Sequence, residues 1–151
     1  MTTRIDYGTV APGAIKGMLA TNGYHDQSTV EQKLRRFVEL RASQINGCGY
    51  CIWLHARQLR QLGETENRIE STADWRSADC FGEPERAALN WAEIVTRITD
   101  GVPSDDAYKQ LQQHFSEIQI VDLTSIIANM NALNRMAISF LHEAPVGAGR
   151  G

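Results

Sequence analysis

Apolar residues recur at helical spacing along most of the chain. The first clear helix carries its apolar side chains on one face, with Arg41 inside the same stripe: Leu34, Phe37, Val38 and Ile45. Ser28 and Glu31 before it form a capping-box pattern, in which the two side chains satisfy free backbone N–H groups. Asn46 and Gly47 predict its end, because these residues tolerate the left-handed conformation found there.

Further helices follow with their own start and stop residues. A second helix is predicted from Cys48 to about Leu62, with Gly63 as its stop, and residues 63–75 form a short helix or turn region. Pro84 suits the first turn of the next helix, because its missing N–H is not needed there.

The last helices are marked by serine caps. Ser104 starts a shorter helix, and Ser116 with Gln119 repeats the capping box before a long segment that reaches about Leu141. Apolar residues of this segment occupy more than one face, so we expect it to be covered on several sides, in part by another subunit. Because no alternating strand pattern competes, we predict an all-α fold.

Composition indicates one soluble domain. The 151 residues are 42% hydrophobic with a formal net charge of −3, which gives no reason to expect nucleic acid or a membrane as partner. No apolar stretch resembles a signal peptide or a transmembrane span, so the cytoplasm is the expected location. We predict a single domain over 1–151, with a core of about 8–142 and a loose tail over 144–151.

The candidate chemistry lies in "INGCGYCIWLHARQL", residues 45–59. Three cysteines in a chain without an export signal argue against a structural disulfide framework. Cys48 and Cys51 should lie in the first turn of a helix, where free N–H groups and the helix dipole favour a thiolate. His55 follows one turn later on the same face, and could take the thiol proton.

Other interpretations of this motif remain open at this point. Two thiols and an imidazole could bind zinc, with Cys80, His25 or Glu39 as a fourth ligand. Structural zinc sites more often combine two separated ligand pairs, and the sequence has no second C-x-x-C and no H-x-x-x-H motif. Covalent haem would need a histidine where Ile52 stands. The cysteines could also be small buried hydrophobes beside a core histidine.

Four segments resemble the alkylhydroperoxidase D (AhpD)-like branch of the carboxymuconolactone decarboxylase-like superfamily: "ELRASQINGCGYCIWLHARQL", "GETENRIE", "WRSADCFGEPERAALNWAEIVT" and "VDLTSIIANMNALNRMAISF". They occur in unbroken order over about residues 8–142. The resemblance implies an all-helical antioxidant protein that needs no cofactor and assembles as a homo-oligomer, such as a trimer or hexamer.

The resemblance also implies residue roles. Cys51 would attack the hydroperoxide and become a sulfenic acid, Cys48 would resolve it to a disulfide, and His55 would transfer protons. An external dithiol, from a lipoylated or a thioredoxin-like protein, would reduce the disulfide, and the best-known members also have a peroxiredoxin partner. The decarboxylase branch lacks the cysteine pair, so a decarboxylase-like enzyme is the less favoured alternative, together with a non-catalytic zinc-binding or structural oligomer.

Two positions depart from the family pattern. Arg36 stands where the best-known peroxidases have a relay glutamate, and Tyr50 replaces a histidine before the second cysteine. Glu39 lies one turn after Arg36 and is a candidate for the relay, although an exposed Arg36–Glu39 ion pair is the simpler expectation.

The remaining polar and aromatic residues suggest structural roles. Arg41 should meet a carboxylate, and the tryptophans should be core or interface anchors. Cys80 should be a buried or idle thiol. Polar residues within the last helix should form a network between helices or subunits, with a role in lining the active cavity as the second choice: Asn129, Asn131, Asn134 and Arg135. Surface positions are expected for His25, His114 and His142.

Overall fold

The computed structural model describes residues 2–145, and every regular element within them is helical. The α-helices are α1 (Tyr7–Val10), α2 (Pro12–His25), α3 (Gln32–Asn46), α4 (Gly49–Gln61), α5 (Glu66–Ser71), α6 (Glu83–Thr96), α7 (Asp105–Gln112) and α8 (Glu117–Ser139). Short 3₁₀ turns occupy Thr72–Asp74 and Ile98–Asp100. The predicted all-α class is confirmed, whereas the loose tail predicted for 144–151 lies mostly outside the described residues.

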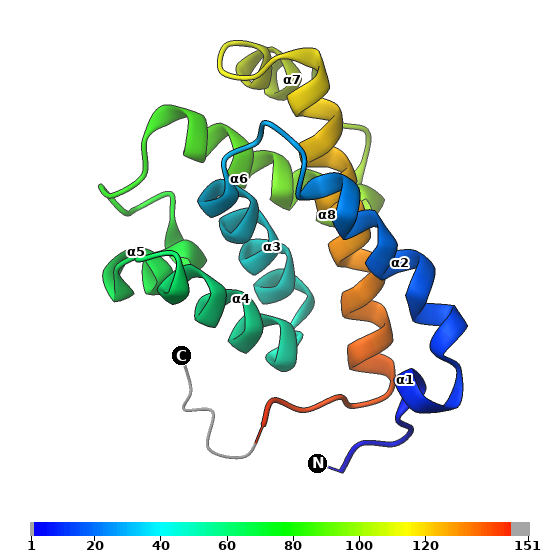
Figure 1. Cartoon of the computed structure of the whole chain (residues 1–151). Coiled ribbons are helices and arrows are strands. Elements are labelled where there is room, and N and C mark those ends of the chain that lie inside the picture. The colour runs from blue at the N-terminus through cyan, green and yellow to red at the C-terminus, as the bar shows by residue number, and fades with distance from the viewer. Residues whose placement is uncertain (1, 146–151) are drawn as a thin grey trace.

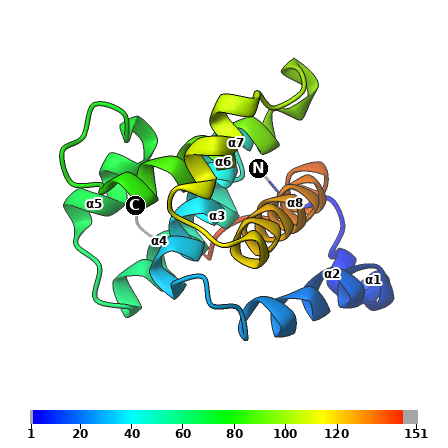
Figure 2. The same ribbon diagram turned by 90° about the horizontal axis from the view of Figure 1, so that it is seen from above.

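Helix α3 lies at the centre of the fold and packs against α4, α6 and α8 (Figure 1). Helix α8 lies between α2 on one side and α3 on the other, as Figure 2 shows from above. The largest apolar cluster fills the space between α3, α6 and α8, and includes Val38, Ala88, Trp91, Leu123 and Ile127. Trp75 and Trp91 are buried as predicted, while Trp53 is half-buried.

Local end signals placed most helix boundaries correctly. Gly47 ends α3 with a φ of 73°, in the left-handed region that favours glycine. Cys48 caps α4, since its side chain accepts a hydrogen bond from the Cys51 N–H. Ser104 caps α7, and Ser116 with Gln119 forms the predicted capping box of α8.

The capping box predicted for Ser28 and Glu31 is wrong. The helix begins at Gln32 with Glu31 in the cap position, and no side chain caps it. The Ser28 hydroxyl instead donates to Asp122 Oδ2 of α8 over 2.5 Å. Asp122 is 2% exposed, and Tyr24 also donates to it over 2.7 Å. The Ser28 oxygen accepts the Val30 N–H over 3.1 Å, ahead of the first helical residue, so the long-range contact with Asp122 holds Ser28 outside the cap position.

Helix α2 was not predicted as a separate element. Its sequence "PGAIKGMLATNGYH" has no continuous apolar face, so periodicity gives little signal. It lies against α8 and contributes one wall of the cavity described below. Two residues show its mixed environment, since Ile15 is buried and Leu19 is 50% exposed.

Helix α8 is covered on several sides, as predicted, by α2, α3, α4, α6 and α7. Its 23 residues end at Ser139, two residues before the expected end. None of the described helices is both long enough and apolar enough to cross a membrane. Polar side chains, including Asp122 and Asn134, lie within the buried faces of α8 and form hydrogen bonds with neighbouring helices.

Candidate active site

Cys48 and Cys51 are joined in a disulfide at the start of α4, with their Cα atoms 5.3 Å apart. The Cys51 backbone N–H donates to Cys48 Sγ over 3.3 Å, so Cys48 Sγ receives the hydrogen bond that caps the helix. Both residues are nearly enclosed, at 2% and 4% exposure. The predicted placement of the pair in the first turn of a helix is confirmed, and the pair is present in its oxidised form.

An amide network fixes the turn that carries the disulfide. The Asn46 side chain donates to Asn131 Oδ1 over 3.0 Å and to Asn134 Oδ1 over 2.9 Å. Asn134 in turn donates to Ser43 Oγ over 3.1 Å, which links α8 to α3. The predicted helix-binding network is therefore present, and Asn46, which the sequence marked only as a helix end, belongs to it.

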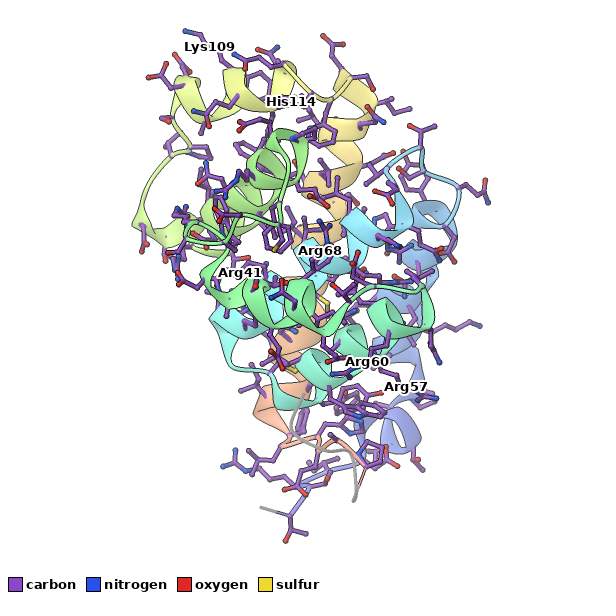
Figure 3. All side chains as sticks on the ribbon, turned by 90° about the vertical axis from the view of Figure 1, so that its left-hand side faces the viewer. Arg41, Arg57, Arg60, Arg68, Lys109 and His114 are labelled. Carbon is purple, nitrogen blue, oxygen red and sulfur yellow. A yellow bond between two sulfur atoms is a disulfide. The ribbon has the colours of Figure 1, made fainter. Side chains whose placement is uncertain are left out.

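His55 lies on the inner face of α4 at 4% exposure, whereas Arg57 and Arg60 extend from the outer face (Figure 3). Its Nδ1 lies 3.3 Å from Glu39 Oε2 and 3.0 Å from Gln58 Oε1. Because both neighbours are acceptors, we assign the hydrogen of the neutral ring to Nδ1. Nε2 faces the opposite way, 3.0 Å from Met130 Sδ, and Met130 belongs to the apolar cluster that contains both cysteines.

Glu39 lies behind His55 as a buried acceptor. It is 5% exposed and accepts hydrogen bonds from Arg35 Nε over 3.1 Å and Arg36 Nη1 over 2.6 Å. Arg35 also donates to Asp26 over 2.6 Å, which ties α3 to the end of α2. The Arg36–Glu39 pair therefore exists, but the expectation that it would be exposed is wrong, because α4 packs against α3 here and its His55 lies against Glu39.

Burial and charge set the ionisation of this pair. Burial by itself would raise the pKa of Glu39, but His55, Arg36 and Arg35 together lower that pKa below 4.5. Burial lowers the pKa of His55 below 6.5, and Arg36 adds to this effect against the opposing Glu39 charge. At neutral pH, Glu39 is therefore ionised, and His55 is a neutral imidazole that can accept a proton.

A cavity of about 420 Å³ opens beside these groups between α2, α3, α4 and α8. Cys51, His55, Glu39 and Tyr50 contribute to its lining, whereas Cys48 does not. Apolar side chains form much of the remaining wall: Ile15, Leu19, Leu54, Met130 and Leu133. Asn129 also lines the cavity, so its lining role, the second choice from sequence, holds for this residue.

The histidines differ from their expected surface positions. His25 is 3% exposed and lies 3.0 Å from Ser125 Oγ of α8. His142 is half-buried, and its ring packs edge-on against Tyr50 with the ring centres 4.4 Å apart. His142 also lines the cavity, so an imidazole lies beside the tyrosine that replaces the family's histidine. His114 is half-buried near the end of α7 (Figure 3).

Two other predicted candidates lie away from the cavity. Cys80 is a free, half-buried thiol that packs against the cluster containing Trp75 and Phe81. Arg41 meets a carboxylate, as expected, through a 2.8 Å hydrogen bond from its Nε to Glu93 Oε1. Among residues 2–145, no group of three or more His, Cys, Asp and Glu side chains could hold a metal ion. Neither Cys80 nor His25 lines the cavity to complete a zinc site.

Comparison with known proteins identifies the class to which this fold and site belong. Residues 12–93 match the Carboxymuconolactone decarboxylase family, and the chain belongs to that family. The uncharacterized protein YdfG of Bacillus subtilis (strain 168) is 35% identical over 144 residues, which cover 95% of this chain and 98% of YdfG.

Solved structures show the same fold. A protein of unknown function from Agrobacterium tumefaciens, suggested to be the antioxidant defence protein AhpD, superposes with a TM-score of 0.93 and 37% identity, over 96% of this chain and 99% of that one. The debrominase Bmp8 has a TM-score of 0.75 at 19% identity, over 89% of this chain and 71% of Bmp8. The chain is therefore an AhpD-like member of the superfamily, whereas the likeness to Bmp8 shows the fold alone.

Proposed function

We propose that the protein is a thiol-dependent peroxidase that reduces organic hydroperoxides through the Cys48–Cys51 dithiol. The observation that carries the proposal is that Cys51 and His55 line one cavity, with His55 Nδ1 held by Glu39 on the far side of the ring. A cavity of this size, with one part of its wall apolar and another part polar, suits a small organic molecule.

The first step oxidises Cys51. In the reduced protein, neutral His55 accepts the Cys51 thiol proton at Nε2, and Glu39 stabilises the resulting imidazolium through Nδ1. The Cys51 thiolate attacks the terminal peroxide oxygen and the O–O bond breaks. The products are a sulfenic acid on Cys51 and an alkoxide that takes the proton from His55 and leaves as the alcohol.

The second step closes the disulfide. Cys48 Sγ lies where the Cys51 N–H and the start of α4 favour a thiolate. Its attack on the Cys51 sulfenic acid forms the S–S bond and releases the oxygen as water after protonation. The resulting disulfide is the form present in the structure.

An external dithiol must then return two electrons to the protein. A lipoylated or thioredoxin-like protein in the cytoplasm would supply them, and no cofactor is required.

The exposed apolar residues of α8, Ile118 at 61% and Val121 at 63%, favour assembly of several copies of the chain.

The test is the reaction of pre-reduced protein with cumene hydroperoxide. We expect one equivalent of peroxide to be consumed and a Cys48–Cys51 bridge to form, as mass spectrometry of the digested protein would show. The C48S variant should stop at a sulfenic acid on Cys51 that dimedone traps, and the C51S variant should lose peroxide reduction at least 1000-fold. Peroxide reduction that persists in C51S would reject the proposal.

Assays on the same protein distinguish the two alternative functions from the proposed one. A decarboxylase-like enzyme would convert a carboxylactone after both thiols had been blocked with iodoacetamide. A structural oligomer would show neither reaction. The buried position of His55 between Glu39 and the sulfur cluster favours the thiol chemistry over both.

A further inference from the structure

The wall of the cavity changes from apolar to polar along two of its helices. In α2, Asn22 follows Leu19 after one turn, so the two residues share a face of the helix. In α4, Gln58 follows Leu54 in the same way, and all four residues line the cavity. Asn22 and Gln58 also belong to the hydrogen-bond network around Glu39. The cavity therefore has a polar end at Glu39.

Neighbouring donors occupy the acceptor atoms at this polar end. Asn22 Oδ1 accepts from Arg35 Nη2 over 3.1 Å, and Gln58 Oε1 lies 3.0 Å from His55 Nδ1. Both carboxylate oxygens of Glu39 accept hydrogen bonds as well. The NH₂ groups of Asn22 and Gln58 then point away from these partners, and no group within residues 2–145 accepts a hydrogen bond from them.

Arg36 differs from Arg35 in the number of nitrogens that it uses. Arg35 donates from Nε, Nη1 and Nη2 and is 4% exposed. Arg36 donates from Nη1 to Glu39, and its side chain is 14% exposed.

The Nε and Nη2 groups of Arg36 have no partner in the described part of the chain. They are also accessible, because the fully buried side-chain nitrogens that lack a partner there are His25 Nδ1 and Arg68 Nε. Nε and Nη2 form one edge of the guanidinium, and such an edge binds a carboxylate through two parallel hydrogen bonds. Arg36 lines the cavity, so this edge is available to a ligand.

We propose that the preferred substrates are organic hydroperoxides that carry a carboxylate, which Arg36 binds through Nε and Nη2. The NH₂ groups of Asn22 and Gln58 are further donors to the same carboxylate. The inference rests on the proposed function, which it deepens by naming the substrate class. A carboxylate offers only acceptor atoms, which match these free donors, and the apolar part of the wall accommodates the hydrocarbon body.

The other acids of the cavity lining do not oppose such a ligand. Asp26 is bonded to Arg35 over 2.6 Å, and its side chain is 62% exposed, so water and salt screen its charge. Asp6 lies at the start of α1, where its carboxylate accepts from the Thr9 N–H and hydroxyl. Neither acid is bonded to Arg36.

The positions of Cys51 and Gln58 indicate where the substrate carries its acid. Both residues line the cavity, and they are seven residues apart in α4. At the rise of an α-helix this separation is about 10 Å. Because the peroxide must reach Cys51, the carboxylate belongs at the opposite end of the substrate. The para positions of a benzene ring separate two groups on this scale.

The bound carboxylate would also assist the chemistry. Burial lowers the pKa of His55, and the charge of Arg36 lowers that pKa further. An anion bound to Arg36 offsets this charge, so His55 becomes a stronger base for the thiol proton of Cys51. Substrate binding and activation of the thiol are thereby coupled.

The test compares two peroxides with one apolar body: cumene hydroperoxide with a para carboxylate, and the methyl ester of that acid. Stopped-flow kinetics of the reduced protein gives the rate for each, and each rate is divided by the rate with free dithiothreitol to remove intrinsic differences. We expect the acid to react at least about tenfold faster than the ester, because charge-assisted hydrogen bonds contribute this much. Equal rates would overturn the inference and leave the peroxidase function in place.

Substitution of Arg36 should change the acid-to-ester ratio of these rates. R36Q should bring the ratio to about one, and R36K, which keeps the charge without the planar edge, should keep part of it. The ratio is the readout because a general effect on Glu39 or His55 changes both rates alike. Q58L leaves the Arg36–Glu39 pair in place and should lower the ratio about threefold. An unchanged ratio in folded R36Q or Q58L would overturn the inference.

Arg57 offers the matched control. It extends from the exposed outer face of α4 and does not line the cavity (Figure 3). R57Q removes the same charge as R36Q and should keep the acid-to-ester ratio of the unmodified protein. If R57Q lowers this ratio as much as R36Q does, long-range attraction explains the preference and a binding role for Arg36 is wrong.

A binding measurement separates this inference from the proposed function. para-Isopropylbenzoate carries the acid but no peroxide, so it cannot oxidise the protein. Calorimetric titration of the disulfide form should show it binding at least about tenfold more tightly than para-isopropylbenzamide, and R36Q should lose this difference. Absence of benzoate binding would overturn the inference. Failure of peroxide reduction with this binding intact would reject the peroxidase function and keep the anion site.

Discussion

Glu39 and Glu93 are two buried carboxylates in arginine-rich surroundings, and their comparison shows what distinguishes the proposed active site from a structural ion-pair network. Glu93, 6% exposed, accepts from Arg41 over 2.8 Å, Trp75 Nε1 over 2.9 Å and Arg76 over 2.5 Å. Burial would raise its pKa, but these donors lower the pKa below 4.5. Glu39 has a similar pKa shift from a similar cause.

The difference lies in the neighbours of each carboxylate. The donors around Glu93 keep their protons throughout the neutral range, so the group binds α3, α6 and the turn at Trp75 together. Glu39 contacts His55, which titrates, and His55 faces the cluster that holds the disulfide. A lowered carboxylate pKa is therefore common to both regions and does not by itself mark the proposed active site. What distinguishes the proposed site is that Glu39 has a titrating neighbour, His55, which faces the cluster with the disulfide.

The largest expected difference is in catalysis. E39Q keeps the shape of the side chain but removes the charge that stabilises the His55 imidazolium, so we expect peroxide oxidation of the reduced protein to slow by about 100-fold. E93Q should leave this rate within a factor of two per folded molecule. Stopped-flow kinetics of the reduced proteins would measure both.

A conservative variant separates positioning from folding. E39D restores the charge, so it should recover part of the rate lost in E39Q, and circular dichroism should report native helix content in both. If E39Q and E93Q lose activity to the same degree, the distinction between the two carboxylates is wrong.

Glu93 should matter for the stability of the fold rather than for catalysis. E93Q leaves three arginines without their carboxylate, which we expect to lower the free energy of unfolding by about 2 kcal/mol, because Arg76 and Arg97 can turn to water. The melting temperature should fall by roughly 4–8 °C. Thermal unfolding followed by calorimetry measures this change, and an unchanged melting temperature would contradict the structural role.

The pH dependence of stability should separate the two regions further. Because burial lowers the pKa of His55 below 6.5, its contribution to stability is complete above pH 6.5 and is lost as the pH falls through its folded pKa. Glu93 contributes above pH 4.5 and loses its contribution below that value. Urea unfolding between pH 6.5 and about pH 5 should give a shallower fall in H55Q than in the unmodified protein.

E93Q is the control for this pH experiment. Its free energy of unfolding should be lower throughout, but the slope of that free energy against pH should equal the slope of the unmodified protein in the same interval. The two slopes should differ only below pH 4.5. His25 also has a pKa lowered by burial, so H55Q should remove part of the fall rather than all of it. An unchanged slope in H55Q would reject a buried neutral imidazole.

The smallest effect is expected at Cys80. This thiol lies on the Glu93 side of the molecule against the cluster of Trp75 and Phe81, away from the cavity. C80S should change neither peroxide oxidation nor reduction by dihydrolipoamide by more than twofold. A larger loss would show that Cys80 takes part in the exchange.

Sequence and structure agree most closely where a feature depends on neighbours within one or two turns. The end of α3 at Gly47, the start of α4 at Cys48 and the capping box of α8 are of this kind. The false cap at Ser28 shows the limit, because Asp122, 94 residues away, accepts the Ser28 hydroxyl and holds that residue outside the cap position. Helix α2 gave no periodic signal, yet it supplies a wall of the cavity.

By itself the sequence determined the all-helical class and the dithiol at a helix start, because helix propensity, capping and the spacing of Cys48, Cys51 and His55 are local properties of the chain. Only the tertiary structure decided that Glu39 is buried against His55 and that Cys51 and His55 line one cavity. Those features depend on how α2, α3, α4 and α8 pack, and packing joins residues whose separation along the chain carries no short-range pattern.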